Sequence, residues 1–177
     1  MVFIEEFGVV AVVVSRRKLV LGGAALAALG AGALAVHLPD TAPGWEVFSE
    51  GEQALVTAIG EALFPPGNPL GVSGADVPLA RRVDELLGVE LDPEMTPIFR
   101  YVARAVDDLT FVSRGARFAA LPLEARVDVL RHWDDPDVFP RRAMYDLLRL
   151  IYGMAFFNLP EVHAAIGWRS RCALGAA

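Results

Sequence analysis

The pattern of apolar and polar positions after residue 48 is typical of amphipathic helices. Apolar side chains recur three or four positions apart, so they fall on one face of a helix. No stretch there shows the strict alternation and the β-branched enrichment of a strand. The pattern therefore predicts an all-α domain over residues 49–171, built as a single small bundle of about five to six helices.

Capping residues and prolines mark where these helices begin. Ser49 and Glu52 form a capping box, in which each side chain satisfies a backbone donor of the first turn. Pro65-Pro66 predicts the end of that helix. Further starts are predicted at Asp76, Asp92-Pro93, Pro122, Val138 and Pro160. The helix from about Val138 to Phe157 is expected to be the longest.

Each predicted helix carries an apolar stripe that we expect to face the core. The inward positions, in chain order, are Leu55, Val56, Ile59, Leu63, Val77, Ala80, Val83, Leu86, Leu87, Met95, Ile98, Phe99, Val102, Val106, Leu123, Val127, Leu130, Trp133, Leu147, Leu148, Ile151 and Met154. Phe118, Phe156 and Phe157 are likewise expected in the core rather than around a cofactor.

The segment from Leu19 to Val36 breaks this pattern, because it has neither a charged residue nor a polar face. A helix of that length would reach about 27 Å, barely the hydrocarbon thickness of a bilayer. Its glycines would each cost a helix about 1 kcal/mol relative to alanine, and alanine gives it only weak hydrophobicity. A buried core helix is therefore disfavoured, which leaves an export signal or a membrane anchor.

An export signal needs basic residues, an apolar segment and a small-residue cleavage site, in that order. Arg16 and Arg17 supply the basic residues within S-R-R-x-L, which resembles the twin-arginine export signal. Ala33 and Ala35 supply the cleavage site, which predicts cutting before Val36. We therefore expect a twin-arginine signal peptide that the twin-arginine translocase reads. An uncleaved anchor stays the alternative.

This interpretation divides the chain into a signal over residues 1–35, a linker over residues 36–48 and the helical domain. Residues 1–14 are apolar and contain Glu5 and Glu6, where the start of an export signal should be positive. They are either a genuine extension or, as we favour, the product of a start placed upstream of Val10 to Val14. After export the domain is expected in the periplasm or on the outer face of the cytoplasmic membrane.

The net charge of the chain bears on which kinds of molecule it can bind. The net charge is −6 at pH 7, which disfavours nonspecific binding to nucleic acids. Cys172 is the only cysteine, so no disulfide can form within the chain. A domain without disulfides suits the twin-arginine route, because that route carries proteins that fold before export.

The sequence shows no arrangement typical of catalysis or metal binding. His37, His132 and His163 are the only histidines, and they lack the spacing of a zinc site. The acidic groups at Asp107-Asp108 and residues 134–137 are expected to cap helices. We therefore predict no catalytic, cofactor-binding or metal-binding residue in this chain.

The connection from Pro65 to Ala75 is longer than the roughly 2–8 residues that usually join two helices. Its prolines and glycines predict a shaped loop, and binding residues concentrate on such loops. Leu70 and Val72 join no helical stripe, so they and the adjacent Asp76 are candidate contacts with a partner. The alternative is that Leu70 and Val72 fold back as a plug over the first helix.

The order of these parts resembles the gluconate 2-dehydrogenase subunit 3 family, the small subunit of membrane-associated sugar and alcohol dehydrogenases. The resemblance covers residues 48–168. It is carried by a helix that ends in E-x-x-x-P at Glu61 to Pro65, a glycine-bearing loop, and the helix start Gly74-Ala75-Asp76. The closing element P-x-V-x-x-x-I-G-[YW] appears at Pro160 to Trp168.

Membership would imply a division of labour between two chains. The large subunit of such complexes is an FAD-dependent oxidoreductase of the glucose–methanol–choline type, which holds the flavin and the catalytic histidine. The small subunit is non-catalytic, carries the twin-arginine signal and assists the maturation and export of its partner, and a cytochrome c subunit can accept the electrons. The alternative is an exported or membrane-tethered helical module, binding or structural, that serves an unrelated partner.

Overall fold

The computed structural model describes residues 38–168, and the part of the chain that it describes contains helices and no strands. The helices are α2 (Glu50–Leu63), α3 (Leu79–Glu85), α4 (Met95–Arg114), α5 (Leu123–Trp133), α6 (Phe139–Phe156) and α7 (Pro160–Ala165). A π-helical turn, Leu86–Glu90, extends α3, and a 3₁₀ turn, Phe118–Ala120, follows α4. The predicted all-α bundle is confirmed.

The predictions for the N-terminal segment lie outside the described residues. They concern the export residues Arg16 and Arg17, the cleavage residues Ala33, Ala35 and Val36, and the signal or anchor that these residues would form. Cys172 and the last residues of the predicted domain lie beyond the described part as well.

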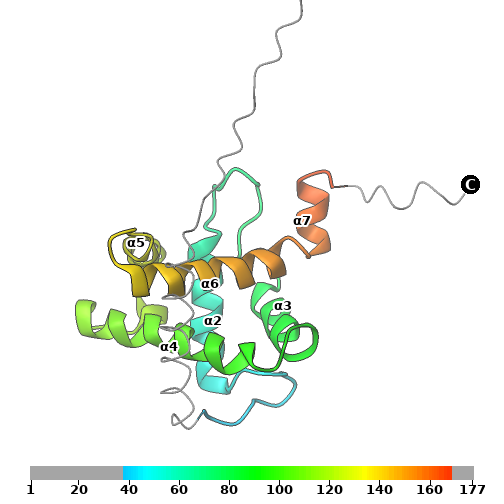
Figure 1. The fold of residues 1–177 in the computed structure, drawn as a ribbon. Coiled ribbons are helices and arrows are strands. Elements are labelled where there is room, and N and C mark those ends of the chain that lie inside the picture. Colours follow the sequence, from blue (N-terminus) through cyan, green and yellow to red (C-terminus); the bar gives the residue numbers. More distant parts are fainter. Residues whose placement is uncertain (1–37, 169–177) are drawn as a thin grey trace, which may run out of the picture.

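Helix α2 lies at the centre of the bundle and packs against α3, α4, α5 and α6 (Figure 1). Its inward side meets large side chains from these helices that are fully buried, including Phe99, Leu148, Ile151 and Tyr152. The hydroxyl of Tyr152 donates a hydrogen bond of 2.7 Å to the carbonyl oxygen of Val56. A buried tyrosine with its hydroxyl satisfied costs little, and this one fixes α6 across α2.

The first turn of α2 is held by the predicted capping box. The side chain of Glu52 accepts hydrogen bonds from the Ser49 backbone N–H (3.0 Å) and hydroxyl (2.8 Å). The same carboxylate is bound by Arg100 at 2.7 Å and by Arg104 at 3.1 Å, both from α4. Burial raises the pKa of Glu52, but the hydrogen bonds from Arg100 and Ser49 outweigh it and hold the pKa below its usual value. The cap therefore also joins α2 to α4.

The end of the predicted linker belongs to the fold, so the prediction of a linker over residues 36–48 is wrong there. Val47 and Phe48 are buried in the core. The buried carboxylate of Asp84, on α3, accepts hydrogen bonds from the backbone N–H groups of Glu46 (2.7 Å), Val47 (3.0 Å) and Phe48 (3.1 Å). A non-helical segment lacks the internal partners that a helix gives its N–H groups, and here the bend at residues 46–47 directs three of them to one carboxylate.

Most of the predicted inward stripes are confirmed, and four details differ. The longest described helix is α4, with 20 residues, rather than α6, with 18. The second helix begins at Leu79 rather than at Asp76. The third helix begins at Met95, two residues after Pro93. Met154 (44% exposed) and Phe157 (47% exposed), both expected in the core, lie at the surface, because none of the described elements covers that side of α6.

Candidate functional site

The loop between α2 and α3 is shaped by its own polar side chains. The side-chain amide of Asn68 donates to the carbonyl oxygens of Pro65 (2.8 Å) and Val72 (2.7 Å), and its oxygen accepts from the N–H of Leu70 (2.9 Å). One side chain therefore joins both limbs of the loop. Gly67 and Gly71 lie in the left-handed region, with φ of 77° and 73°, which other residues rarely adopt.

The returning limb of the loop is fixed against α2 by a close backbone approach at Gly74. Its N–H donates to the carbonyl oxygen of Phe64 at 2.7 Å. A Cβ atom at Gly74 would lie only 2.5 Å from the carbonyl oxygen of Gly60, so no other residue fits without displacing the backbone. The end of the loop is therefore rigidly placed on the central helix.

The structure places the predicted contact residues of this loop as follows. Leu70 and Val72 are half-buried and pack against the hydrophobic core, which favours the plug over an outward contact with a partner. Asp76 is exposed, but its carboxylate accepts from the N–H (2.8 Å) and hydroxyl (2.7 Å) of Ser73. These hydrogen bonds hold the pKa of Asp76 below its usual value. All three residues thus act within the loop, and their contact with a partner stays a prediction.

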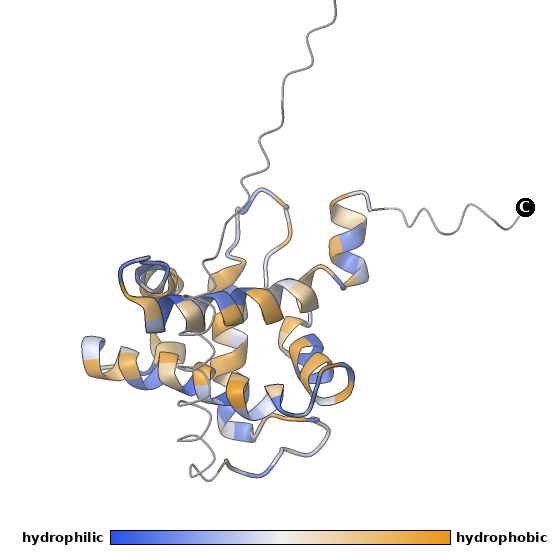
Figure 2. Ribbon diagram, viewed as in Figure 1, coloured by the Kyte–Doolittle hydropathy of each residue, from blue (hydrophilic) through white to orange (hydrophobic). Residues whose placement is uncertain are grey.

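A row of exposed apolar side chains on α6 was not predicted. Leu150 (57% exposed), Met154 (44%) and Phe157 (47%) are spaced three to four positions apart, so they share one side of the helix and its C-terminal cap. We call these three residues the α6 stripe. The hydropathy colouring in Figure 2 shows apolar residues along α6 and on the loop between α2 and α3. The spacing of Met154 from the other apolar residues predicts that they share one face of the helix. It does not predict whether another element covers that face.

The α6 stripe is connected to both the loop and α7 by side-chain contacts. The ring of Phe64, at the start of the loop, stacks on Phe156 at 3.9 Å and meets the edge of Phe157 at 6.4 Å between ring centroids. A ring nitrogen of His163, Nε2, lies 2.7 Å from the carbonyl oxygen of Phe157. The backbone N–H of Trp168 in turn donates to the carbonyl oxygen of His163 at 2.8 Å. These contacts fix the loop between α2 and α3, the end of α6 and helix α7 against one another.

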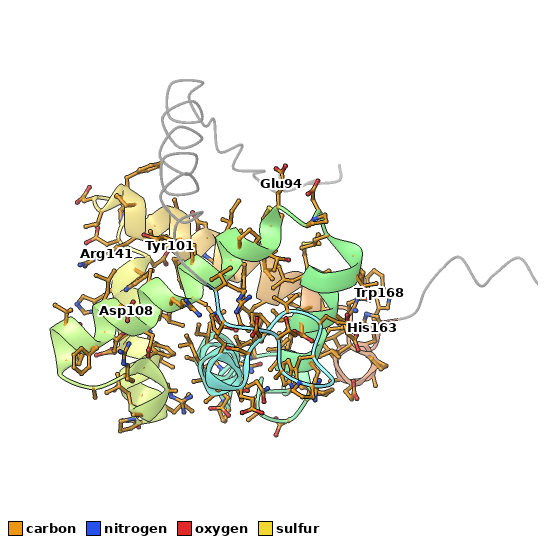
Figure 3. The ribbon with its side chains drawn as sticks, turned by 90° about the horizontal axis from the view of Figure 1, so that it is seen from below. Glu94, Tyr101, Asp108, Arg141, His163 and Trp168 are labelled. Carbon is orange, nitrogen blue, oxygen red and sulfur yellow. The ribbon has the colours of Figure 1, made fainter. Side chains whose placement is uncertain are left out.

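Helix α7 and the residues after it add exposed apolar side chains close to the end of the stripe. Ile166 is 40% exposed and Trp168 is 62% exposed. His163 and Trp168 lie at one end of the molecule in Figure 3, and Asp108 and Arg141 lie at the other end. Exposed apolar residues that gather in this way mark surfaces that bind another protein or a membrane.

The acidic and histidine residues considered for chemistry are engaged in structural contacts. Asp107 and Asp108 lie within α4 rather than at a helix end, which corrects the prediction that they cap a helix, and both bind Arg117, at 2.9 and 2.6 Å. Asp134 does lie at the end of α5, where it pairs with Arg142. Within residues 38–168, no three histidine, cysteine or acidic side chains are grouped closely enough to hold a metal ion.

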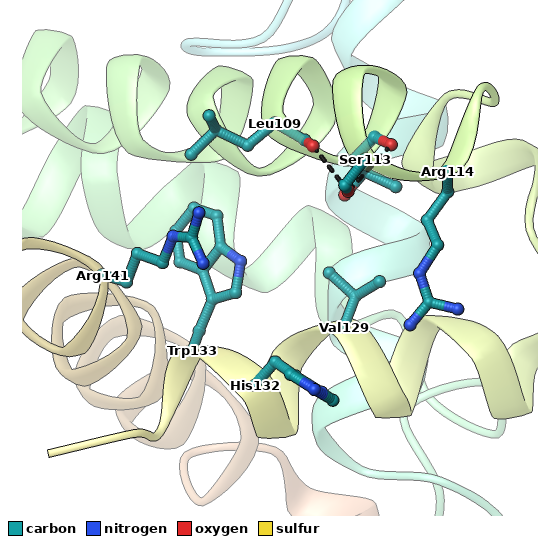
Figure 4. Close-up of a pocket in the computed structure, with 8 residues that line it drawn as sticks. Leu109, Ser113, Arg114, Val129, His132, Trp133 and Arg141 are labelled. Atoms are coloured by element: carbon teal, nitrogen blue, oxygen red, sulfur yellow. Dashed lines mark hydrogen bonds between the residues drawn. The ribbon is translucent and has the colours of Figure 1, made fainter. Parts of the chain in front are cut away.

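A second surface feature is a pocket of about 260 Å³ between α4, α5 and the start of α6 (Figure 4). Arg114, Trp133 and Arg141 line it, and so do the apolar side chains of Leu109 and Val129. This pocket could not be predicted from the sequence, because its residues come from three helices and form no motif.

None of the helices in the described part is long and apolar enough to cross a membrane. Comparisons of the chain with models of protein families, with curated proteins and with solved structures find no match. The candidate sites therefore stand on the geometry and on the sequence alone.

Proposed function

We propose that this chain is a non-catalytic accessory subunit that carries a twin-arginine export signal and assists the maturation and export of an FAD-dependent sugar or alcohol dehydrogenase. The flavin and the catalytic groups would belong to the partner, as in the gluconate 2-dehydrogenase subunit 3 family that the sequence resembles. The proposal places the protein in the periplasm or on the outer face of the cytoplasmic membrane.

The observation that carries this proposal is the order of parts along the chain. Arg16 and Arg17 precede an uncharged segment, and a helical domain with an uncovered apolar surface follows. A signal that exports folded proteins can serve a second protein only if that protein is bound before export. An accessory subunit therefore needs a docking surface on its folded domain.

The α6 stripe is the surface that best fits this requirement. Leu150, Met154 and Phe157 are exposed on a rigid helix, and Phe157 is buttressed by Phe64 and Phe156. A large aromatic residue and a methionine are common at the energetic centre of protein interfaces. The proposal assigns the stripe to contact with the flavin subunit.

Co-expression with a candidate FAD-dependent oxidoreductase that lacks an export signal of its own tests the proposal, and co-purification is the readout. We expect Leu150→Asp with Met154→Asp to abolish co-purification of that protein and of its FAD absorbance. Both side chains are exposed, so the variant should keep the helicity and the melting temperature of the wild type. Val112→Asp is the matched control, because Val112 is 81% exposed on α4 and lies outside the stripe.

The export signal is tested in the same cells. We expect Arg16→Lys with Arg17→Lys to keep both proteins in the cytoplasm, because the receptor reads guanidinium geometry that lysine does not copy. Equal periplasmic amounts of variant and wild type would contradict the twin-arginine signal. Export of the chain without any flavin oxidoreductase bound to the wild type would instead favour the alternative, a helical module with an unrelated partner.

A further inference from the structure

The pocket between α4, α5 and α6 is rich in hydrogen-bond donors and has no acidic lining. Arg114 comes from the last turn of α4, Trp133 from the last turn of α5 and Arg141 from the first turn of α6. In Figure 4 the guanidinium group of Arg141 is drawn over the indole of Trp133, and that of Arg114 lies on the other side of Val129. Arg114 also lines an adjoining depression, which contains two acidic residues, Glu124 and Asp128.

The two arginines of this pocket differ from most other arginines of the bundle. Arg82, Arg100, Arg104, Arg117, Arg126 and Arg142 each form an ion pair with a carboxylate. Within residues 38–168, neither Arg114 nor Arg141 forms one. In a chain whose net charge is −6, two such cations beside one pocket produce a local positive field.

A third donor points into the same pocket. The side chain of Trp133 is only 4% exposed, and it lines this pocket. Figure 4 shows the indole nitrogen turned toward the space between the helices. The indole N–H is a hydrogen-bond donor only, so a ligand in the pocket would contribute the acceptor.

We infer that this pocket binds a small molecule through an oxyanion, either a phosphate or a carboxylate. Guanidinium groups bind both anions through paired, charge-assisted hydrogen bonds. The indole N–H supplies a further donor, and Leu109 and Val129 offer an apolar wall to the rest of the ligand. A volume of about 260 Å³ lies just below the usual range for ligand sites, about 300–1,000 Å³, so the ligand is small. This inference does not rest on the proposed function.

Titration of the full-length chain with three probes tests the inference. Phenyl phosphate and benzoate present the two oxyanions on the same ring, and benzyl alcohol presents the ring without a charge. The readout is the ¹H–¹⁵N signal of the Trp133 indole, assigned with Trp133→Phe. We expect a saturable shift with at least one anion and none with benzyl alcohol, and the anion that binds more tightly identifies the chemistry.

Arginine variants show whether the shift reports this pocket. We expect Arg114→Gln and Arg141→Gln each to weaken binding about tenfold or more, because each removes a charge-assisted contact. Both side chains are exposed, so the fold should persist, which circular dichroism checks. Arg149→Gln is the control, since Arg149 lies over Tyr145 on α6 and does not line the pocket. A shift that does not saturate, or that is equal in all three variants, would overturn the inference.

Discussion

The two ends of the bundle present opposite kinds of surface. At the α7 end, the α6 stripe is apolar, and the polar groups beside it are hydrogen-bonded within the protein. At the other end, the pocket between α4, α5 and α6 is lined by Arg114 and Arg141, which form no ion pair with any residue of the described part. Binding at the first surface is favoured because apolar area is removed from water. Binding at the second is favoured because the ligand supplies an acceptor for the donors of the pocket.

This difference means that the two ends should respond differently to salt. Binding through apolar area is little affected by ionic strength, because it does not depend on charge. Binding between exposed charges weakens as salt rises, since the Debye length falls from about 10 Å at 0.1 M to about 3 Å at 1 M. Raising the salt concentration should therefore weaken the proposed anion binding and leave the proposed partner contact largely intact.

The largest expected effect comes from a change that affects both ends at once. Glu52→Ala leaves Arg100 buried without its carboxylate and removes the capping box of the central helix. Breaking a buried ion pair from one side costs about 3–5 kcal/mol, so the whole bundle should lose stability. Chemical denaturation of the variant and of the wild type measures the loss. Unchanged stability would show that the pair makes no net contribution.

The pH dependence of stability offers a finer check on the same residue. The pKa of Glu52 is held below its usual value in the folded state, so its ionised form stabilises the fold above the unfolded pKa of about 4.5. That contribution is lost as the pH falls through the lower, folded pKa. Glu52→Gln should therefore show a shallower loss of stability in acid than the wild type.

A smaller and more local effect is expected at the loop that adjoins the α6 stripe. Gly74→Val would force a Cβ atom against the carbonyl oxygen of Gly60, and the backbone must shift to relieve the clash. Overpacking of this kind costs about 1–3 kcal/mol. The melting temperature should fall, and contacts of Phe64 with Phe157 should be disturbed, whereas anion binding by the distant pocket should persist. If Gly74→Val disturbed the contacts of Phe64 with Phe157 and also abolished anion binding, the two ends of the bundle would not be independent.

The smallest of these effects is expected at Asn68. Asn68→Ala removes the side chain that joins the two limbs of the loop, at a cost of about 1–2 kcal/mol for the hydrogen bonds lost. Amide hydrogen exchange should become faster at Leu70 and stay unchanged at α4 and α5. Asn68→Asp is a useful companion, because it keeps the acceptor for Leu70 but loses both donors.

Local signals in the sequence were sufficient for most of the helices. The capping box at Ser49 and the prolines at Pro122 and Pro160 predicted the starts of α2, α5 and α7, because each acts on the turn beside it. Asp76 misled because its carboxylate closes a turn with Ser73 before α3 begins. Capping residues show that a turn is closed, but not whether a helix follows at once.

Long-range contacts explain what could not be predicted. Residues 45–48 have no helical periodicity, and contacts with residues far along the chain, such as the carboxylate of Asp84 and the ring of Phe99, make them part of the core. The pocket needs side chains from three helices, so no window of sequence contains it. The α6 stripe follows a clear helical spacing, but the side of α6 that stays uncovered depends on where α2 and α4 pack.

The hydrogen bonds that Asp84 and Arg100 form with the segment before α2 have a mechanical consequence. Arg100 donates to the carbonyl oxygen of Pro39 at 2.8 Å, and Asp84 holds the N–H groups of Glu46 to Phe48. A pull on the chain from the N-terminal side of Pro39 would load the Arg100 contact first and the Asp84 contacts next. Tension would thus reach α3 and α4 before it could unwind α2, so the domain should resist extraction from this end more than its thermal stability indicates.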